Sequence, residues 1–286
     1  MNSENVNFQD ILSSQSLVLA ERDLELLARP ELRPIRLQLE FLKPEMALAE
    51  HNVRSTVVVF GSTEIVERQA AELRLRDAQS AAERSPDDRG LAREVTRCKQ
   101  LLAKSHFYDE AREFGRIISS RMQTDEERHY VVVTGGGPGI MEAANRGAYD
   151  VGAKSVGLNI LLPSEQQPNR FITPELCFQF HYFALRKLHF LLRARALVAF
   201  PGGFGTLDEL FDALTLRQTQ RMQSIPIILY SQSYWERVLD LQFLADEGVI
   251  DEKDLSIVQY AETPQQVIDI IARCDDSVHS LGDADR

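Results

Sequence analysis

The sequence predicts an α/β protein: a doubly wound, Rossmann-like parallel sheet with helices on both faces, plus an N-terminal helical extension and a helical-hairpin insertion. From residue 108 onward, short apolar runs rich in Val and Ile alternate with amphipathic stretches, a pattern typical of parallel sheets covered by helices. Two of these runs end directly in glycine-rich turns. Because ligands in such sheets bind at the carboxyl ends of the strands, the two turns indicate where a site lies.

The chain before the sheet is expected to be helical and to carry no chemistry of its own. Over residues 1–50 apolar residues recur at helical spacing, which predicts one helix beginning at Ser16 and a second over 32–52. Residues 53–60 form a Val-rich run that suits a buried strand. The segment 64–104 is dense in Ala, Glu, Arg and Leu around one Pro-containing turn, so it predicts a helical hairpin with solvated faces.

The rest of the chain completes one expected nucleotide-binding domain over residues 51–274, followed by a loose tail at 275–286. The apolar periodicity predicts helices at 108–122, 138–152, 182–194, within 201–220, 233–249 and 263–274. The short apolar runs predict strands at 129–134, 154–160, near 171–178, 196–200, 225–230 and 256–261.

Composition narrows the classes of function. The 286 residues include 32 basic and 43 acidic side chains, a formal net charge of −11, which disfavours a nucleic-acid-binding surface. Three cysteines without a CxxC pair and six scattered histidines give no zinc-site pattern. The first residues lack a signal peptide's basic start, and no apolar run approaches the roughly 20 residues of a membrane span. We therefore expect a cytoplasmic protein with no metal, no cofactor, and no membrane or nucleic-acid partner.

The first glycine turn, Gly135-Gly136-Gly137, follows a predicted strand and opens a predicted helix. Glycines let a ligand approach the backbone, and a helix start offers unpaired N–H groups to an anion. The turn differs from the dinucleotide fingerprint GxGxxG. Contact with a phosphate or a ribose is the favoured interpretation, and a tight strand-to-helix turn without a ligand is the alternative.

The second glycine turn follows another buried strand and contains Gly202, Gly203 and Gly205, with Thr206 adding a hydroxyl. These residues can hold an anion, although the segment is not a Walker loop because no Lys follows the last glycine. Glu209 has two interpretations that the spacing leaves open. It is either a catalytic carboxylate or the third-position partner of Thr206 in a capping box.

A basic pair, Arg186 and Lys187, interrupts the apolar stretch of the helix before that strand. Such a pair invites an anionic partner, but a surface salt bridge or an extended side chain with its charge in water is the leading interpretation from these residues alone. His189, one turn later, is expected to be a packed histidine.

These residues together resemble the LOG family, long labelled "possible lysine decarboxylase". The segment 201–209 matches the family signature PGGxGTxxE, and the upstream Arg-Lys pair, the GGG turn and the VVVFGS run ending at Ser62 also match. The likeness covers about 53–60 and 106–260, most of the chain.

The resemblance implies a Rossmann-like nucleoside 5′-monophosphate phosphoribohydrolase, which cleaves the N-glycosidic bond to release a free base and ribose 5-phosphate. It implies Arg186 and Glu209 as the catalytic pair, and a homodimer or larger homo-oligomer. It also implies that the 5′-phosphate is held by Gly202, Gly203, Gly205 and Thr206. The wider set expected to bind substrate adds Gly135, Gly136, Gly137, Lys187 and Ser62.

The sequence departs from the short, cytokinin-activating members of that family. They lack the N-terminal extension and the 64–104 insertion, and their first glycine turn reads GGxxGLMG rather than GGGPGIM. The Leu-Asn-Ile segment at 158–160 and the LPSEQQPN segment at 162–169 look more like longer bacterial relatives described as nucleotide-binding proteins. The base therefore stays open between adenine, prenylated adenine and others.

The residue types suit glycosidic cleavage, which passes through an oxocarbenium-like transition state. Glu209 could stabilise that charge or activate the attacking water, and Arg186 could steer the nucleotide. No residue is clearly placed to protonate the leaving base, although Glu142 is one candidate, and Asp208 is not expected to face the same site.

The alternative is a non-catalytic nucleotide-binding or carrier protein, which needs the glycines but not the Arg-Glu pair. A lysine decarboxylase is disfavoured, because no lysine stands out as a Schiff-base residue.

Overall fold

The computed structural model describes residues 3–124, 126–162 and 167–274. The chain divides into two compact units, Met1–Glu45 and Met46–Arg286. The expected tail at 275–286 lies outside the described residues, and so do residues 163–166 of the predicted 162–169 loop. Among the residues that are described, no helix combines the length and the apolar character needed to cross a bilayer.

The first unit is helical, but the helix expected from Ser16 is wrong. The structure has α1 (Ser3–Leu12), two single 3₁₀ turns, and the short α2 (Leu24–Ala28). The break comes at Asp23, whose carboxylate accepts the backbone N–H of Leu26 at 2.8 Å and so caps α2. The second predicted helix is present as α3 (Arg33–Glu50), which contains Pro44 and ends within the second unit.

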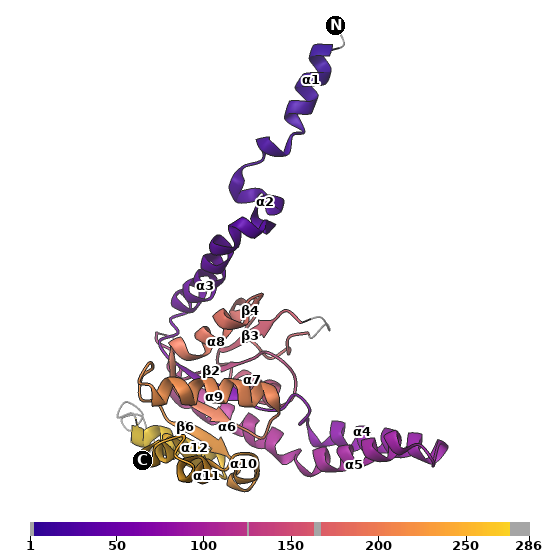
Figure 1. The fold of residues 1–286 in the computed structure, drawn as a ribbon, viewed down its shortest axis with the longest axis vertical. Helices are drawn as coiled ribbons and strands as arrows, with labels where there is room; N and C mark the ends of the chain where they lie inside the picture. The colour runs from indigo at the N-terminus through magenta and orange to yellow at the C-terminus, as the bar shows by residue number, and fades with distance from the viewer. Residues whose placement is uncertain (1–2, 125, 163–166, 275–286) are drawn as a thin grey trace. The chain divides into compact units, whose positions relative to one another are not determined.

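The second unit is built on a seven-stranded sheet whose strands are all parallel (Figure 1). Its strands are β1 (Thr56–Phe60), β2 (Val131–Thr134), β3 (Ser155–Ile160), β4 (Cys177–Phe180), β5 (Ala194–Ala199), β6 (Ile227–Tyr230) and β7 (Val258–Ala261). They lie in the order β4-β3-β2-β1-β5-β6-β7. Every residue of β1, β2 and β6 is buried, because helices cover both faces of the sheet; this explains their continuous apolar sequence.

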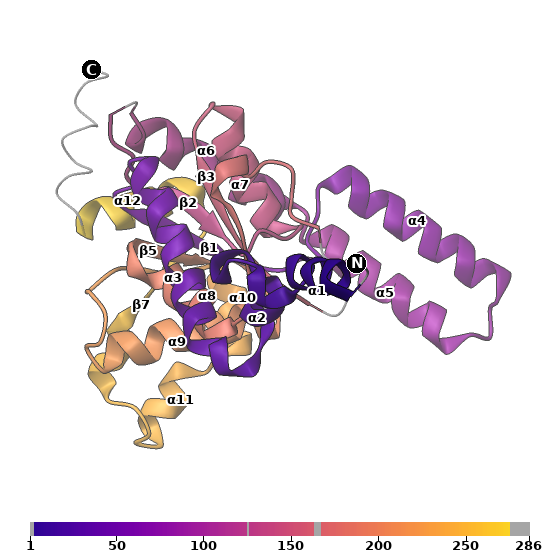
Figure 2. The same ribbon diagram turned by 90° about the horizontal axis from the view of Figure 1, so that it is seen from above.

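Figure 2 shows helices on both sides of the sheet, as predicted. On one face, α6 (His106–Met122), α7 (Ile140–Asp150) and α12 (Pro264–Cys274) bury side chains such as Phe114, Ile140 and Ile271. On the other face, α8 (Phe183–Leu192), α9 (Phe204–Gln218) and α10 (Gln232–Val238) bury Phe190, Leu210 and Trp235. The doubly wound, Rossmann-like fold class is confirmed.

The predicted helical hairpin is also present, as α4 (Arg68–Arg84) and α5 (Arg89–Ala103), which lie side by side in both views (Figures 1 and 2). The carboxylate of Asp88 begins α5 by accepting the N–H groups of Gly90 and Leu91 at 2.7 and 3.2 Å. The single helix expected over 233–249 is wrong. The chain forms α10 and then α11 (Leu241–Asp246), because Asp240 accepts the N–H of Phe243 and starts a new helix.

The strand order places a topological switch point between β1 and β5. From β1 the chain adds β2, β3 and β4 on one side, and then returns to add β5, β6 and β7 on the other. In open parallel sheets, ligands bind beside the carboxyl ends of the strands at such a point. Here the loops that follow β1, β2 and β5 are bonded to each other. The N–H of Ser62 donates to the carbonyl of Pro201 at 3.0 Å, and the N–H of Ile140 donates to the carbonyl of Ser62 at 3.1 Å.

Candidate functional site

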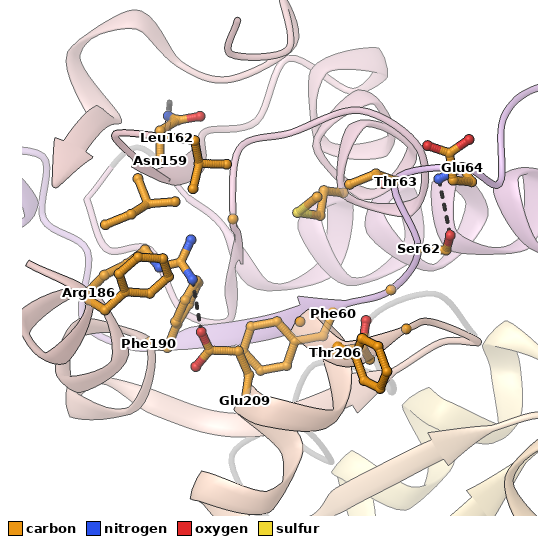
Figure 3. Close-up of a pocket in the computed structure, with 18 residues that line it drawn as sticks. Phe60, Ser62, Thr63, Glu64, Asn159, Leu162, Arg186, Phe190, Thr206 and Glu209 are labelled. Atoms are coloured by element: carbon orange, nitrogen blue, oxygen red, sulfur yellow. Dashed lines mark hydrogen bonds and ion pairs between the residues drawn. The ribbon is translucent and has the colours of Figure 1, made fainter. Parts of the chain in front are cut away.

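A pocket of about 430 Å³ opens at this switch point (Figure 3). One part of its wall is backbone and small polar groups from the loops after β1 and β5, including Gly61, Ser62, Gly203, Gly205 and Thr206. The rest is largely apolar and aromatic, including Phe60, Met141, Ile160, Phe183 and Phe190. A small-molecule site commonly combines an apolar wall with a few polar groups that fix the orientation of the ligand.

Arg186 and Glu209 meet in this pocket. Arg186 lies on α8 and Glu209 on α9, and the guanidinium Nη2 lies 3.0 Å from the carboxylate Oε1 (Figure 3). Their side chains are only 13% and 7% exposed, so the charges face each other with little water to screen them. The guanidinium also lies 5.1 Å from the ring centre of Phe183 and 5.6 Å from that of Phe190, which stabilises its charge. The sequence places these residues far apart, and the packing of α8 beside α9 joins them.

Burial raises the pKa of the Glu209 carboxyl above its ordinary value, and the opposing attraction of Arg186 and Lys187 does not cancel this effect. Lys187 itself lies outside the pocket wall. Its ammonium group is 2.9 Å from Asp208 and 3.7 Å from Glu209. Lys187 therefore contributes positive charge behind Glu209 while pairing mainly with the exposed Asp208.

The capping-box interpretation of Glu209 does not hold. The N-cap of α9 is Gly203, without a side-chain cap, and Thr206 already lies inside the helix. Because Thr206 is not the cap residue, Glu209 has no capping partner there and bonds to Arg186 instead. The sequence alone could not decide between the two interpretations of Glu209, because it does not fix the residue at which the helix begins.

The phosphate cradle expected at the second glycine turn has the right elements for an anion. Gly203, Gly205 and Thr206 line the pocket at the N-terminus of α9, where unpaired N–H groups and the helix dipole favour negative charge. Ser62 faces them from the loop after β1, and its Oγ accepts the N–H of Glu64 at 3.0 Å. Gly202 lies behind this wall, where its carbonyl accepts a hydrogen bond from the Tyr234 hydroxyl at 2.6 Å.

At the first glycine turn, only Gly135 lines the pocket. Gly136 has a φ of +76°, which favours glycine, and its N–H donates to the Thr134 hydroxyl at 3.0 Å. The Asn169 amide donates to the carbonyls of Gly136 and Gly137 at 3.2 and 3.1 Å. These two glycines shape the turn behind the pocket wall. The role of Asn169 in holding this turn was not predicted from the sequence.

Three other residues considered from the sequence lie away from the pocket wall. Glu142 accepts a hydrogen bond from the Tyr108 hydroxyl at 2.8 Å. Asp208 points to Lys187 with 58% of its side chain exposed, as its position on the helix predicts. His189 is buried with its ring 5.4 Å from that of Phe180, which confirms a packed histidine.

We expect Gly205→Ala to separate stability from anion binding. A Cβ at this position would meet no atom within 4 Å, and alanine is about 1 kcal/mol more favourable than glycine inside a helix. The added methyl group would occupy the pocket at the N-terminus of α9. The melting temperature should stay the same or rise while affinity for inorganic phosphate or a nucleotide falls.

The matched control for that variant is Gly202→Ala, whose Cβ would lie 2.1 Å from the Thr206 hydroxyl and should therefore cost stability. Denaturation curves and binding titrations on both variants measure the two effects separately. Unchanged phosphate and nucleotide affinity in Gly205→Ala would argue against an anion site at this helix start.

The fold and the pocket define a Rossmann-like α/β protein with a pocket at the switch point of its sheet. Residues 141–271 match the family model described as "Possible lysine decarboxylase". The chain is 26% identical over 147 residues to the probable cytokinin riboside 5′-monophosphate phosphoribohydrolase LOGL3 of Oryza sativa subsp. japonica, a match covering 49% of this chain and 66% of the rice protein. It is 27% identical over 169 residues to the cytokinin riboside 5′-monophosphate phosphoribohydrolase LOG3 of Arabidopsis thaliana, covering 58% and 74% of the two chains.

These matches confirm the resemblance to the LOG family. Among solved structures, the chain is similar to TM1055, with 23% identity, a TM-score of 0.47, and coverage of 77% of this chain and 99% of that one. A molybdenum cofactor binding protein from Rippkaea orientalis gives 23% identity and a TM-score of 0.40, covering 58% and 86% of the two chains.

Proposed function

We propose that this protein is a nucleoside 5′-monophosphate phosphoribohydrolase. It hydrolyses the N-glycosidic bond of AMP or a related purine nucleotide, including a prenylated adenine nucleotide, to a free base and ribose 5-phosphate. The observation that carries the proposal is the buried Arg186–Glu209 pair in the same pocket as a helix start suited to a phosphate. The similarity to named phosphoribohydrolases supports the same reaction.

The phosphate end of the nucleotide would bind at the N-terminus of α9 and the loop after β1. Backbone N–H groups and the hydroxyls of Ser62 and Thr206 supply donors there. An acidic protein can bind a phosphate in this way, because these donors are dipoles that leave no trace in the net charge. The aromatic and aliphatic wall of the pocket, with Phe60, Phe183 and Met141, would cover the ribose and the base.

Cleavage would then proceed at the anomeric carbon of the ribose. The bond between this carbon and the base nitrogen breaks with its electron pair leaving on the base, and positive charge develops on the ribose ring. The Glu209 carboxylate stabilises that charge and accepts a proton from the attacking water, whose oxygen forms the new bond to carbon. The base leaves as an anion and takes a proton from the solvent, while Glu209 returns its proton to the solvent, so that overall one water molecule is divided between the ribose and the base. Arg186 holds Glu209 in place, and its positive charge lowers the pKa of the carboxyl against the larger, opposite effect of burial.

The experiment is incubation of the purified protein with purine and pyrimidine 5′-monophosphates, with free base and ribose 5-phosphate quantified together. Equal amounts of the two products would support the hydrolase. Binding of nucleotides without turnover across the whole panel would instead support the non-catalytic carrier. Release of phosphate without free base would contradict both, because it would mean attack at the phosphate ester.

The proposal includes self-association as a homodimer or larger homo-oligomer, which the resemblance implies. Light scattering at several protein concentrations, with and without AMP, measures it. A monomer at all concentrations that still turns over nucleotide would remove self-association from the proposal and leave the reaction intact.

A further inference from the structure

Asn159 is a buried amide at the carboxyl end of β3, and only 5% of the residue is exposed. Its Nδ2 group donates to the carbonyl of Phe178 at 3.1 Å and to the Sγ of Cys177 at 3.4 Å, both on the neighbouring β4. A carbonyl can only accept a hydrogen bond, so the nitrogen of the amide must be on that side. Both of its N–H groups are therefore committed to the protein, and the orientation of the amide is fixed.

The other end of the amide, Oδ1, has no hydrogen-bond partner among the described residues. Asn159 and Arg186 both line the pocket, and Figure 3 shows them on the same side of the view, with Asn159 above Arg186. Gly136 leaves room for this oxygen, because a Cβ at position 136 would lie 2.3 Å from it. Among the described residues, the fully buried side-chain atoms without a partner do not include this oxygen. Oδ1 is therefore accessible from the pocket, where a ligand or water can donate a hydrogen bond to it.

We propose that Asn159 is a specificity-determining residue whose Oδ1 accepts a hydrogen bond from an N–H group on the base of the bound nucleotide. This inference rests on the proposed function, because it takes the ligand to be a nucleotide with its phosphate at the start of α9. That helix follows β5, which pairs with β1, whereas Asn159 is on β3, two strands beyond β1. Neighbouring strands are about 4.8 Å apart, so Asn159 lies about 10 Å across the sheet from the end of β1.

In a nucleoside monophosphate the base lies at a comparable distance from the phosphate. Asn159 would therefore face the base of a nucleotide whose phosphate is bound at the start of α9. Because the N–H groups of Asn159 are bonded to β4, the side chain offers the pocket only the acceptor Oδ1. This oxygen favours a base with an amino group and disfavours a base that presents only acceptors at that position. A ribose hydroxyl is the other ligand group that could donate to Oδ1, and the experiment separates it from the base. Asn159 does not touch the reacting atoms in this arrangement, so its effect is on which nucleotide binds.

The experiment measures dissociation constants by calorimetry for two matched pairs of ligands: AMP with purine riboside 5′-monophosphate, and GMP with IMP. Each pair differs by one exocyclic amino group. For the wild-type protein we expect the amino-bearing member of at least one pair to bind about 10- to 100-fold more tightly. Asn159→Ala should remove that discrimination while affinity for the member without the amino group stays within a few-fold. Because the ligand pairs test the wild-type protein directly, a variant that fails to fold leaves the comparison intact.

Cys177→Ala is the matched control, since it removes one partner of Nδ2 and leaves Oδ1 in place, so discrimination should persist. Equal affinity within both pairs would overturn the proposal. The proposal would also be overturned if the discrimination depended on the 2′- or 3′-hydroxyl, as tested with 2′-deoxy-AMP and 3′-deoxy-AMP, because the donor would then be on the ribose. Discrimination without turnover would support the role of Asn159 and reject the hydrolase, and absence of binding by all the nucleotides would reject both.

Discussion

Glu209→Gln is expected to lower kcat for nucleotide hydrolysis by about 100- to 10,000-fold, the range typical of a lost catalytic acid or base. Glutamine keeps the size of the side chain and can still pack against Arg186, but it has no negative charge and cannot take a proton from water. The dissociation constant of the nucleotide should change much less, because the phosphate is held at the start of α9. Single-turnover rates and calorimetric titration on the same protein measure the two quantities.

The neighbouring Asp208→Asn is the control for this variant. It removes a carboxylate from the same helix turn, but Asp208 is mostly exposed and pairs with Lys187 outside the pocket. Its kcat should stay within a few-fold of the wild type. If Glu209→Gln retains full activity, Glu209 has no catalytic role, whatever the reaction proves to be.

The raised pKa of Glu209 also predicts how hydrolysis and stability depend on pH. Hydrolysis requires the ionised carboxylate, so the acid limb of kcat/KM should lie above the pKa of about 4.3 of an ordinary glutamate. Since burial raises the folded-state pKa above the unfolded value, the native state holds this proton more tightly. The contribution of Glu209 to stability is then fully present below the unfolded pKa and is lost as pH rises through the folded pKa. Glu209→Gln should remove both the acid limb and that pH-dependent change in the free energy of unfolding.

Arg186→Met is expected to be the most destabilising change in the pocket, by about 3–5 kcal/mol, because it leaves the charge of Glu209 buried without its main partner. Activity should also fall sharply, since the carboxylate either gains a proton or turns away. Lys187, with its ammonium group 3.7 Å from Glu209, offsets only part of the loss. Urea denaturation at pH 7 measures the free energy of unfolding.

The double variant Arg186→Met with Glu209→Gln makes the reason testable. It should be more stable than Arg186→Met alone, because the uncompensated charge is gone. Lys187→Met is the control: it removes a partly buried charge whose main partner, Asp208, is exposed, and it should cost at most about 1 kcal/mol. A double variant no more stable than Arg186→Met would contradict this reason, because removal of the charge of Glu209 would then relieve nothing.

The sheet was predictable because its strands are buried on both faces and therefore read as continuous apolar runs, as in Val57 to Phe60. The glycine turns marked the right edge of the sheet, since a glycine cluster directly after a buried strand is typical of a loop that a ligand approaches closely. Helix breaks were missed at Asp23 and Asp240. In each case a carboxylate accepts an N–H three residues later and starts a new helix, a local choice that apolar periodicity does not record.

The role of Asn159 could not be read from the sequence for a different reason. Its hydrogen bonds depend on the pairing of Asn159 with Gln179 across β3 and β4, and on the φ of Gly136. Both are set by tertiary structure. A polar residue near the end of an apolar strand, as in Leu-Asn-Ile, is the only signal the sequence carried.

The position of β1 at the centre of the sheet has a consequence for how the domain comes apart. β1 joins two halves, one built from β2, β3 and β4 and the other from β5, β6 and β7, and the pocket draws walls from both. A ligand held across that seam opposes their separation, so its binding free energy adds to the cohesion of the whole sheet rather than to one loop. Pairing of β1 with β5 also closes a long stretch of chain, which carries a loop-closure entropy cost that contacts across the sheet must offset. A molecule bound in the pocket therefore reports that β1 has paired on both of its sides.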